Sequence, residues 1–225
     1  YNLRFDVISI GQGTEDCNIE DVRTNYLWRP KSMKSMIDKV EHYYLFNSLN
    51  DPAFQNLMEV NNYDLGVQGG GLGIIQENVI SKFNIGLLNM HPGDLPEYRG
   101  SSAPEWQLYE GREVVATCHL IDTGIDTGDI LGKKKLALDY SDYYLMRAEI
   151  YPEMALYLAE VVQKIVADNS VCSLEKQNEK HAQYRSYIGD AKIEDLKEKM
   201  KLGIENRIKK IIANILCVSS DDIND

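Results

Sequence analysis

The stretch IGLLNMH at residues 85–91 and the stretch VVATCHLIDTGIDTGDIL at residues 114–131 decide the fold. In each, a short apolar run that is typical of a buried strand leads into a polar loop. Side chains two apart on a strand share a face, so Asn89 and His91 are expected to project together while Met90 points to the opposite layer. The glycine-bracketed loop after the second run presents Asp126. These three polar groups, an amide, an imidazole and a carboxylate, form a candidate site for acyl transfer.

Outward from these stretches, short apolar runs alternate with helical segments. Residues 3–13 and 63–67 predict strands, and residues 51–60 predict a helix with Asp51 as its N-cap. Residues 141–168 predict a further helix, with a break or kink at Pro152. This alternation predicts an α/β fold with a largely parallel sheet, although hairpin-like pairing around residues 129–138 would make the sheet mixed.

Composition limits the classes of function. The chain has 225 residues, 44% apolar and 26% charged, which suits one main globular domain. Its formal net charge of −11 disfavours nucleic acid as a partner. No apolar run is long enough to span a bilayer and no secretory signal is visible, so we expect no membrane association and a cytoplasmic location.

The spacing of cysteines and glycines argues against a metal site, a disulfide scaffold and a dinucleotide cofactor. The four cysteines lie far apart, without a Cys-x-x-Cys pair or a histidine at ligand spacing, so we expect neither a metal site nor a disulfide scaffold. Gly11-Gln12-Gly13 follows a predicted strand but lacks the third glycine of a dinucleotide-binding loop, which argues against NAD.

A set of ordered matches surrounds the candidate site. The chain carries Asn89-x-His91, Leu95-Pro96-x-Tyr98-Arg99-Gly100, Pro104, Trp106 and Gly124-x-Asp126-x-Gly128. This pattern resembles the signature of the folate-dependent formyltransferases, the family of methionyl-tRNA formyltransferase, glycinamide ribonucleotide formyltransferase and the amino-sugar N-formyltransferases. The likeness extends, more weakly, over about residues 50–168.

The resemblance implies a Rossmann-like, mostly parallel sheet flanked by helices, with a small C-terminal helical extension. It also implies an enzyme that moves a formyl group from 10-formyltetrahydrofolate to an amine, with Asn89, His91 and Asp126 as the catalytic residues. In this scheme the Asn89 amide and a protonated His91 donate hydrogen bonds to the developing oxyanion. Asp126 keeps His91 charged and accepts the amine proton.

The glycine-rich stretch that follows residue 67 occupies the place of the pterin-binding loop of this family. The residues assigned to folate binding on this basis are Gly70, Gly71, Leu72, Gly73, Ile74 and Ile75, together with Ile125. The loop has more glycine than the family pattern, so the location of the folate loop carries over better than its sequence. Pro92-Gly93-Asp94, outside this loop, is a second departure from the family pattern.

Several alternatives remain open at this point. We expect a small acceptor, such as an amino sugar nucleotide or an amino acid derivative, rather than the initiator tRNA of methionyl-tRNA formyltransferase. A formyltetrahydrofolate deformylase, which hydrolyses the donor, would use the same three residues. A non-catalytic, carrier-associated binding module would not use them at all.

Three regions are predicted along the chain: a catalytic domain at residues 1–168, an extension at residues 169–200, and an amphipathic helix within residues 201–225. The last region, IENRIKKIIANILCVSSDDIND, is similar to the first helix and loop of acyl carrier proteins. An ordinary packing helix is the alternative, because apolar residues at 204, 208, 211, 212 and 215 make one helical face in either case.

Overall fold

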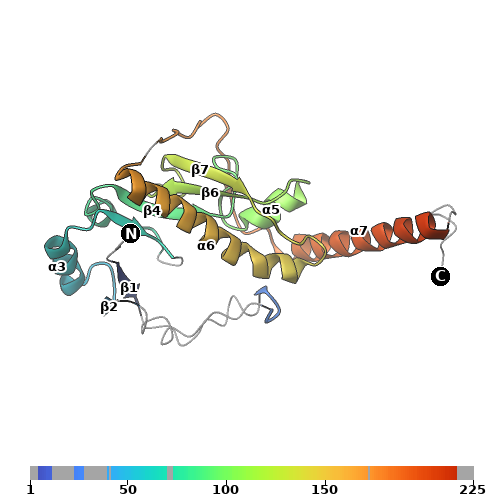
Figure 1. Ribbon diagram of the computed structural model, residues 1–225, viewed down its shortest axis with the longest axis horizontal. Coiled ribbons are helices and arrows are strands. Elements are labelled where there is room, and N and C mark those ends of the chain that lie inside the picture. The colour runs from blue at the N-terminus through green and yellow to red at the C-terminus, as the bar shows by residue number, and fades with distance from the viewer. Residues whose placement is uncertain are drawn as a thin grey trace.

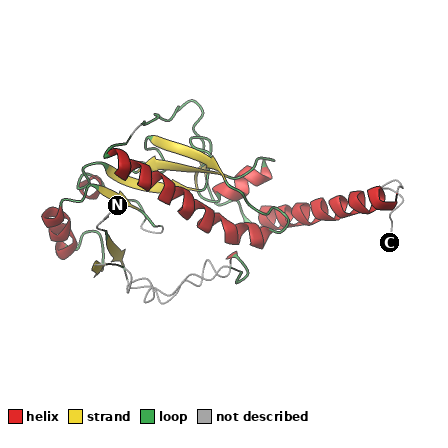
Figure 2. Ribbon diagram, viewed as in Figure 1, coloured by secondary structure: helices red, strands yellow, loops and turns green. Residues whose placement is uncertain are grey.

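A four-stranded sheet lies at the centre of the computed structural model, which describes residues 5–11, 23–27, 40, 42–69, 73–171 and 173–216 (Figures 1 and 2). Its strands, in spatial order, are β3 (Leu65–Val67), β4 (Gly86–His91), β6 (Val115–Leu120) and β7 (Ile130–Lys135). The strands alternate with helices along the chain, so the predicted α/β fold is confirmed.

The central sheet is mixed rather than mostly parallel. β3 and β4 are parallel, but β4 and β6 are antiparallel, and so are β6 and β7. A short loop joins β6 to β7, and a parallel return would need a crossover connection of a dozen or more residues. The expectation of a mostly parallel sheet is therefore wrong for this sheet, and the hairpin alternative is correct.

One face of the sheet is covered by α6 (Tyr143–Asp168) (Figure 1). Its buried residues Met146, Ile150 and Met154 recur every four residues and pack with Leu88 and Met90 of β4 in one apolar cluster. The helix continues through Pro152, so no break occurs there, and the alternative of a kink stays a prediction.

A second apolar cluster forms around α3 (Pro52–Asn61) and α4 (Glu77–Ile80), with Phe54, Met58 and Leu87 in its interior. The side chain of Asp51 accepts a hydrogen bond from the Ala53 N–H at 2.9 Å, which confirms the predicted N-cap. The parallel pair β1 (Asp6–Ile10) and β2 (His42–Phe46) packs at the border of this cluster.

Residues 173–216 first pack against β5 (Arg99–Gly100) and α5 (Ala103–Tyr109) and then extend away from the sheet. The short strand β8 (Tyr184–Arg185) pairs in parallel with β5, which precedes α5. The last helix, α7 (Asp190–Leu216), begins beside α5 and α6 and then extends away from the rest of the molecule (Figure 1). Among the described residues, no helix is long and apolar enough to span a bilayer.

Candidate active site

The antiparallel register of β4 and β6 places Asn89 directly opposite His119. The amide nitrogen Nδ2 of Asn89 lies 3.2 Å from Nε2 of His119. His91, two residues further along β4, projects to the same side as Asn89, while Met90 packs against α6 in the opposite layer. The face assignment made from the sequence is therefore confirmed.

Asp126 reaches this pair from the loop between β6 and β7. Its Oδ2 lies 3.5 Å from Nδ1 of His91, and its Oδ1 lies 3.7 Å from Nε2 of His119. The Gly100 N–H donates to Oδ2 at 2.8 Å. The structure thus brings together the three predicted residues Asn89, His91 and Asp126.

His119 is the member of this cluster that the sequence reasoning missed. It is only 2% exposed, and its Nδ1 lies 2.7 Å from the carbonyl oxygen of Leu120. A carbonyl can only accept, so the ring proton is on Nδ1, and Nε2 accepts a hydrogen bond from the Asn89 amide. A signal was present in the sequence, because His119 ends the apolar run of β6, but only the strand pairing connects it to Asn89.

His91 is held in a single orientation by the backbone. Its Nε2 donates to the Tyr98 carbonyl at 2.6 Å, which leaves Nδ1 facing Asp126. Complete burial lowers the pKa of His91, and it outweighs the opposing effects of Asp126 and the Tyr98 carbonyl. The neutral imidazole is therefore favoured at pH 7 in the resting protein, and the protonated His91 that the family resemblance implies for the reaction stays a prediction.

Asp126 remains ionised at neutral pH. Burial alone would raise the pKa of this carboxyl group, but the neighbouring His119 and His91 rings and the Gly100 N–H together hold it below its ordinary value. The residue has a φ of 56°, in the left-handed region that side chains with a Cβ rarely adopt. Its carboxylate is thus carried by a backbone conformation that the surrounding loop must enforce.

The loop that carries Asp126 is closed tightly on itself. The Asp122 carboxylate accepts hydrogen bonds from the Gly124 N–H at 3.0 Å and from the Thr127 hydroxyl at 2.5 Å. A Cβ on Gly128 would lie 1.9 Å from the carbonyl oxygen of Leu120, so only glycine fits there. The Gly-x-Asp-x-Gly pattern therefore has a direct steric cause.

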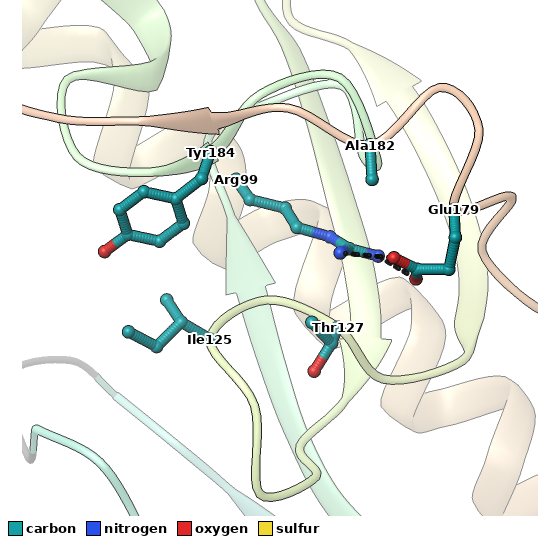
Figure 3. Close-up of a pocket in the computed structure, with 6 residues that line it drawn as sticks. All are labelled: Arg99, Ile125, Thr127, Glu179, Ala182 and Tyr184. Atoms are coloured by element: carbon teal, nitrogen blue, oxygen red, sulfur yellow. Dashed lines mark hydrogen bonds and ion pairs between the residues drawn. The ribbon is translucent and has the colours of Figure 1, made fainter.

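A cavity of about 460 Å³ opens beside Asp126 (Figure 3). It is lined by Arg99, Ile125, Thr127, Glu179, Ala182 and Tyr184. Ile125 and Tyr184 lie on the same side of it, and the Arg99 guanidinium forms an ion pair with Glu179 (Figure 3). The β6–β7 loop, strand β5 and the segment that ends in β8 therefore build this cavity.

The predicted folate-binding residues differ in exposure, and the structure describes only some of them. Gly70, Gly71 and Leu72 lie outside the described residues. Ile74 is 66% exposed and Ile125 is 40% exposed, whereas the side chain of Ile75 is buried in the cluster around Phe54. No cluster of three metal-ligating side chains occurs within the part of the chain that the structure describes.

Comparison with known proteins places this site in a family. The sequence model of the family described as formyl transferase matches residues 25–145, more than half of the chain. Methionyl-tRNA formyltransferase of Caldanaerobacter subterraneus is 32% identical over 143 residues, which cover 62% of this chain and 45% of that protein. The corresponding protein of Finegoldia magna is 29% identical over 138 residues, covering 60% and 44%. The chain thus matches less than half of the length of these curated relatives.

Solved structures share the fold. The formyltransferase PseJ from Anoxybacillus kamchatkensis, in complex with UDP-4,6-dideoxy-4-formamido-L-AltNAc and tetrahydrofolate, aligns with a TM-score of 0.56 at 19% identity, over 80% of this chain and 85% of that chain. A 4-N formyltransferase from Francisella tularensis aligns with a TM-score of 0.54 at 18% identity, over 80% and 76%. Asn89, His91 and Asp126 are brought together by β4 and the β6–β7 loop, and the family model matches more than half of the chain, so this chain belongs to the formyl transferase family.

Proposed function

We propose that this protein transfers a formyl group from 10-formyltetrahydrofolate to an amine on a small molecule. The observation that carries the proposal is the cluster of Asn89, His91, His119 and Asp126 at the end of β4, next to the cavity at Ile125. The cluster holds an oriented amide donor and an ionised carboxylate paired with a neutral imidazole, which are the groups that formyl transfer to an amine requires.

The folate donor fits the loop that follows β3. The Gln68 N–H donates to the Leu88 carbonyl at 2.8 Å, so this loop leaves the sheet next to Asn89. Gly73 has a φ of 69°, which suits close approach of the backbone to a flat heterocycle. We assign pterin contacts to this loop and to the exposed Ile125 side chain, with Ile75 contributing only backbone groups because its side chain is buried. The tetrahydrofolate bound to PseJ supports the choice of donor.

Asn89 supplies the oxyanion contact in this mechanism. Attack of the amine on the formyl carbon places negative charge on the carbonyl oxygen. One N–H of the Asn89 amide is held by Nε2 of His119 at 3.2 Å, and the second N–H is directed by that bond toward the reacting group. Because His119 fixes the amide before the reaction, the donor needs no reorganisation in the transition state.

Asp126 and His91 accept the proton that the attacking amine loses. The attacking amine forms a bond to the formyl carbon and must lose one proton, which passes to the Asp126 carboxylate. Nδ1 of His91, 3.5 Å away, shares this proton because its lone pair faces the carboxylate. The bond between the formyl carbon and the folate nitrogen then breaks, and the same proton returns to that nitrogen. The neutral resting state of His91 thus suits it to receive a proton rather than to donate one.

A small acceptor fits the site better than tRNA does. The cavity of about 460 Å³ is open to solvent and has room for a small molecule, and the net charge of −11 disfavours a polyanion. The curated relatives are methionyl-tRNA formyltransferases, so tRNA is kept as a tested alternative, and so is hydrolysis of the donor.

The test is consumption of 10-formyltetrahydrofolate in the presence of separate acceptors: nucleotide-linked amino sugars, amino acids, methionyl-tRNA, and water alone. We expect formylated product with a small amine, and a loss of about 100- to 1,000-fold in kcat for Asn89→Ala at unchanged donor affinity. Formate release without an acceptor would favour the deformylase. Product with methionyl-tRNA alone would overturn the small-acceptor assignment. Unchanged turnover in Asn89→Ala would overturn the mechanism.

A further inference from the structure

Residues 173–185, here called the strap, connect the two backbone segments that hold Asp126. At one end, Glu175 and Ile130 exchange backbone hydrogen bonds of 2.8 and 2.9 Å, directly after the Asp126 loop. At the other end, β8 pairs with β5, which contains Gly100, the residue whose N–H binds the Asp126 carboxylate. The strap therefore spans the site from the loop that carries the carboxylate to the strand that receives it.

Gln177 lies in the middle of the strap and binds the Asp126 loop directly. Its Nε2 donates to the carbonyl of Asp126 at 2.9 Å and to the carbonyl of Gly128 at 2.8 Å. Its Oε1 accepts from Nε and Nη2 of Arg99 at 3.0 and 2.8 Å. Carbonyls only accept and guanidinium only donates, so the orientation of this amide is determined by its partners.

All four hydrogen-bonding positions of the Gln177 amide are therefore used. Arg99 is itself only 7% exposed, and its Nη2 and Nη1 also donate to the Glu179 carboxylate, at 2.7 and 3.1 Å. A positive charge on the acceptor side of an amide polarises it and strengthens its N–H donors. The hydrogen bonds from Gln177 thus fix the carbonyl of Asp126, the residue whose left-handed φ of 56° needs outside support.

From these contacts we propose that Gln177 is a positioning residue, which fixes the backbone of Asp126 so that its carboxylate meets His91 and the acceptor amine. The proposal rests on the proposed function for its kinetic consequence. Its structural part, that Gln177 restrains the loop at residues 122–129, stands without any acceptor. The required precision is high, since a misplacement of about 1 Å in a catalytic group can cost about 100-fold in rate.

The variant Gln177→Glu tests the hydrogen bonds from Gln177 to the Asp126 loop separately from those to Arg99. It has nearly the same shape and keeps an acceptor for Arg99, but it loses both donors to the loop and turns a carboxylate toward two carbonyl oxygens. The matched control is Lys176→Ala, which alters an exposed neighbour on the same strap. Amide hydrogen exchange across residues 98–131 is measured for both variants, as well as binding of folinic acid, which serves as the donor analogue.

We expect Gln177→Glu to speed exchange in the Asp126 loop and at the Gly100 amide, with folinic acid affinity within about threefold of wild type. With the best amine from the acceptor panel, kcat should fall about 10- to 100-fold while KM for the donor changes little, and the acid limb of the pH–rate profile should move. Lys176→Ala should match wild type in every measurement.

Three results would overturn the assignment. The first is wild-type exchange and wild-type kcat in Gln177→Glu. The second is loss of folinic acid binding together with cooperative unfolding, which would make Gln177 a general stability residue. The third is equal effects in Lys176→Ala. If the wild-type protein transfers formyl to no amine, the proposed function is wrong. The hydrogen-exchange measurement still shows whether Gln177 restrains the Asp126 loop.

Discussion

At the scale of single residues, the site depends on which nitrogen of each histidine carries the proton. The Leu120 carbonyl fixes the tautomer of His119, and the Tyr98 carbonyl fixes that of His91. Each ring therefore presents its other nitrogen to the centre of the cluster. Nε2 of His119 faces the Asn89 amide, and Nδ1 of His91 faces the ionised Asp126 carboxylate.

The buried neutral state of His91 predicts a pH dependence of stability. Because burial lowers the pKa of His91, the unfolded chain binds more protons than the folded protein below the unfolded value of 6.5. Stability is therefore fully present above pH 6.5 and is lost as the pH falls toward the folded pKa. We expect a contribution of up to about 1.4 kcal/mol to the loss between pH 7.5 and 5.5.

Urea unfolding of wild type and His91→Gln at pH 7.5, 6.5 and 5.5 measures this contribution. Titratable groups that do not interact with His91 cancel in the difference, so the difference reports His91 together with its neighbours His119 and Asp126. His91→Gln should lose less stability on acidification than wild type does. An equal loss in the two proteins would contradict a neutral buried His91.

At the scale of elements, the connection between β6 and β7 determines where the carboxylate lies. The β6–β7 hairpin brings the chain back at once, and the loop between its strands is closed by Asp122 and by the close approach of Gly128 to Leu120. The parallel pair β3–β4 has a different role, because it directs the loop after β3 to the same edge. The mixed sheet thus combines a parallel half, which leads to the loop proposed to bind folate, with a hairpin that carries Asp126.

A pair of glycine substitutions tests the steric part of this account. Gly128→Ala places a Cβ 1.9 Å from a backbone oxygen, so the loop must open; we expect a lower melting temperature and at least a 10-fold loss of kcat. Gly203→Ala, within α7, meets no atom within 4 Å and should stabilise the helix by about 0.5–1 kcal/mol.

Thermal melting followed by circular dichroism and formyl transfer assays on the same preparations check both variants. Wild-type turnover in Gly128→Ala would show that the loop tolerates opening, and destabilisation by Gly203→Ala would show that position 203 needs glycine for another reason.

At the scale of the whole molecule, the extension belongs to the site. The strap lines the cavity and binds the Asp126 loop, and the first part of α7 packs on α5 and α6 (Figure 1). The division into residues 1–168, 169–200 and 201–225 stays a prediction, but α7 crosses residue 200 without interruption. Residues 217–225, the end of the segment similar to carrier proteins, lie outside the described residues, so that resemblance also stays a prediction.

Two leucines of α7 differ in exposure, so their substitution compares the packed beginning of the helix with a more exposed position further along it. Leu196 is 4% exposed and belongs to the main apolar cluster, whereas Leu202 is 54% exposed. Leu196→Ala should cost about 2–4 kcal/mol in the free energy of unfolding, and Leu202→Ala less than about 0.5 kcal/mol. Urea unfolding measures both, and equal costs would mean that the distal part of α7 is covered in solution.

The sequence by itself determined the strands β1, β3, β4 and β6, the cap of α3, the shared face of Asn89 and His91, and the glycines that bracket Asp126. These features follow from local geometry: the alternation of a strand, the first turn of a helix, and the space around a backbone atom. Only the tertiary structure decided the antiparallel pairing that sets His119 against Asn89, the neutral state of His91, and the strap that brings Gln177 to Asp126. Those contacts join residues 30 and 51 positions apart. Strand register and burial depend on the whole chain, so no local pattern contains them.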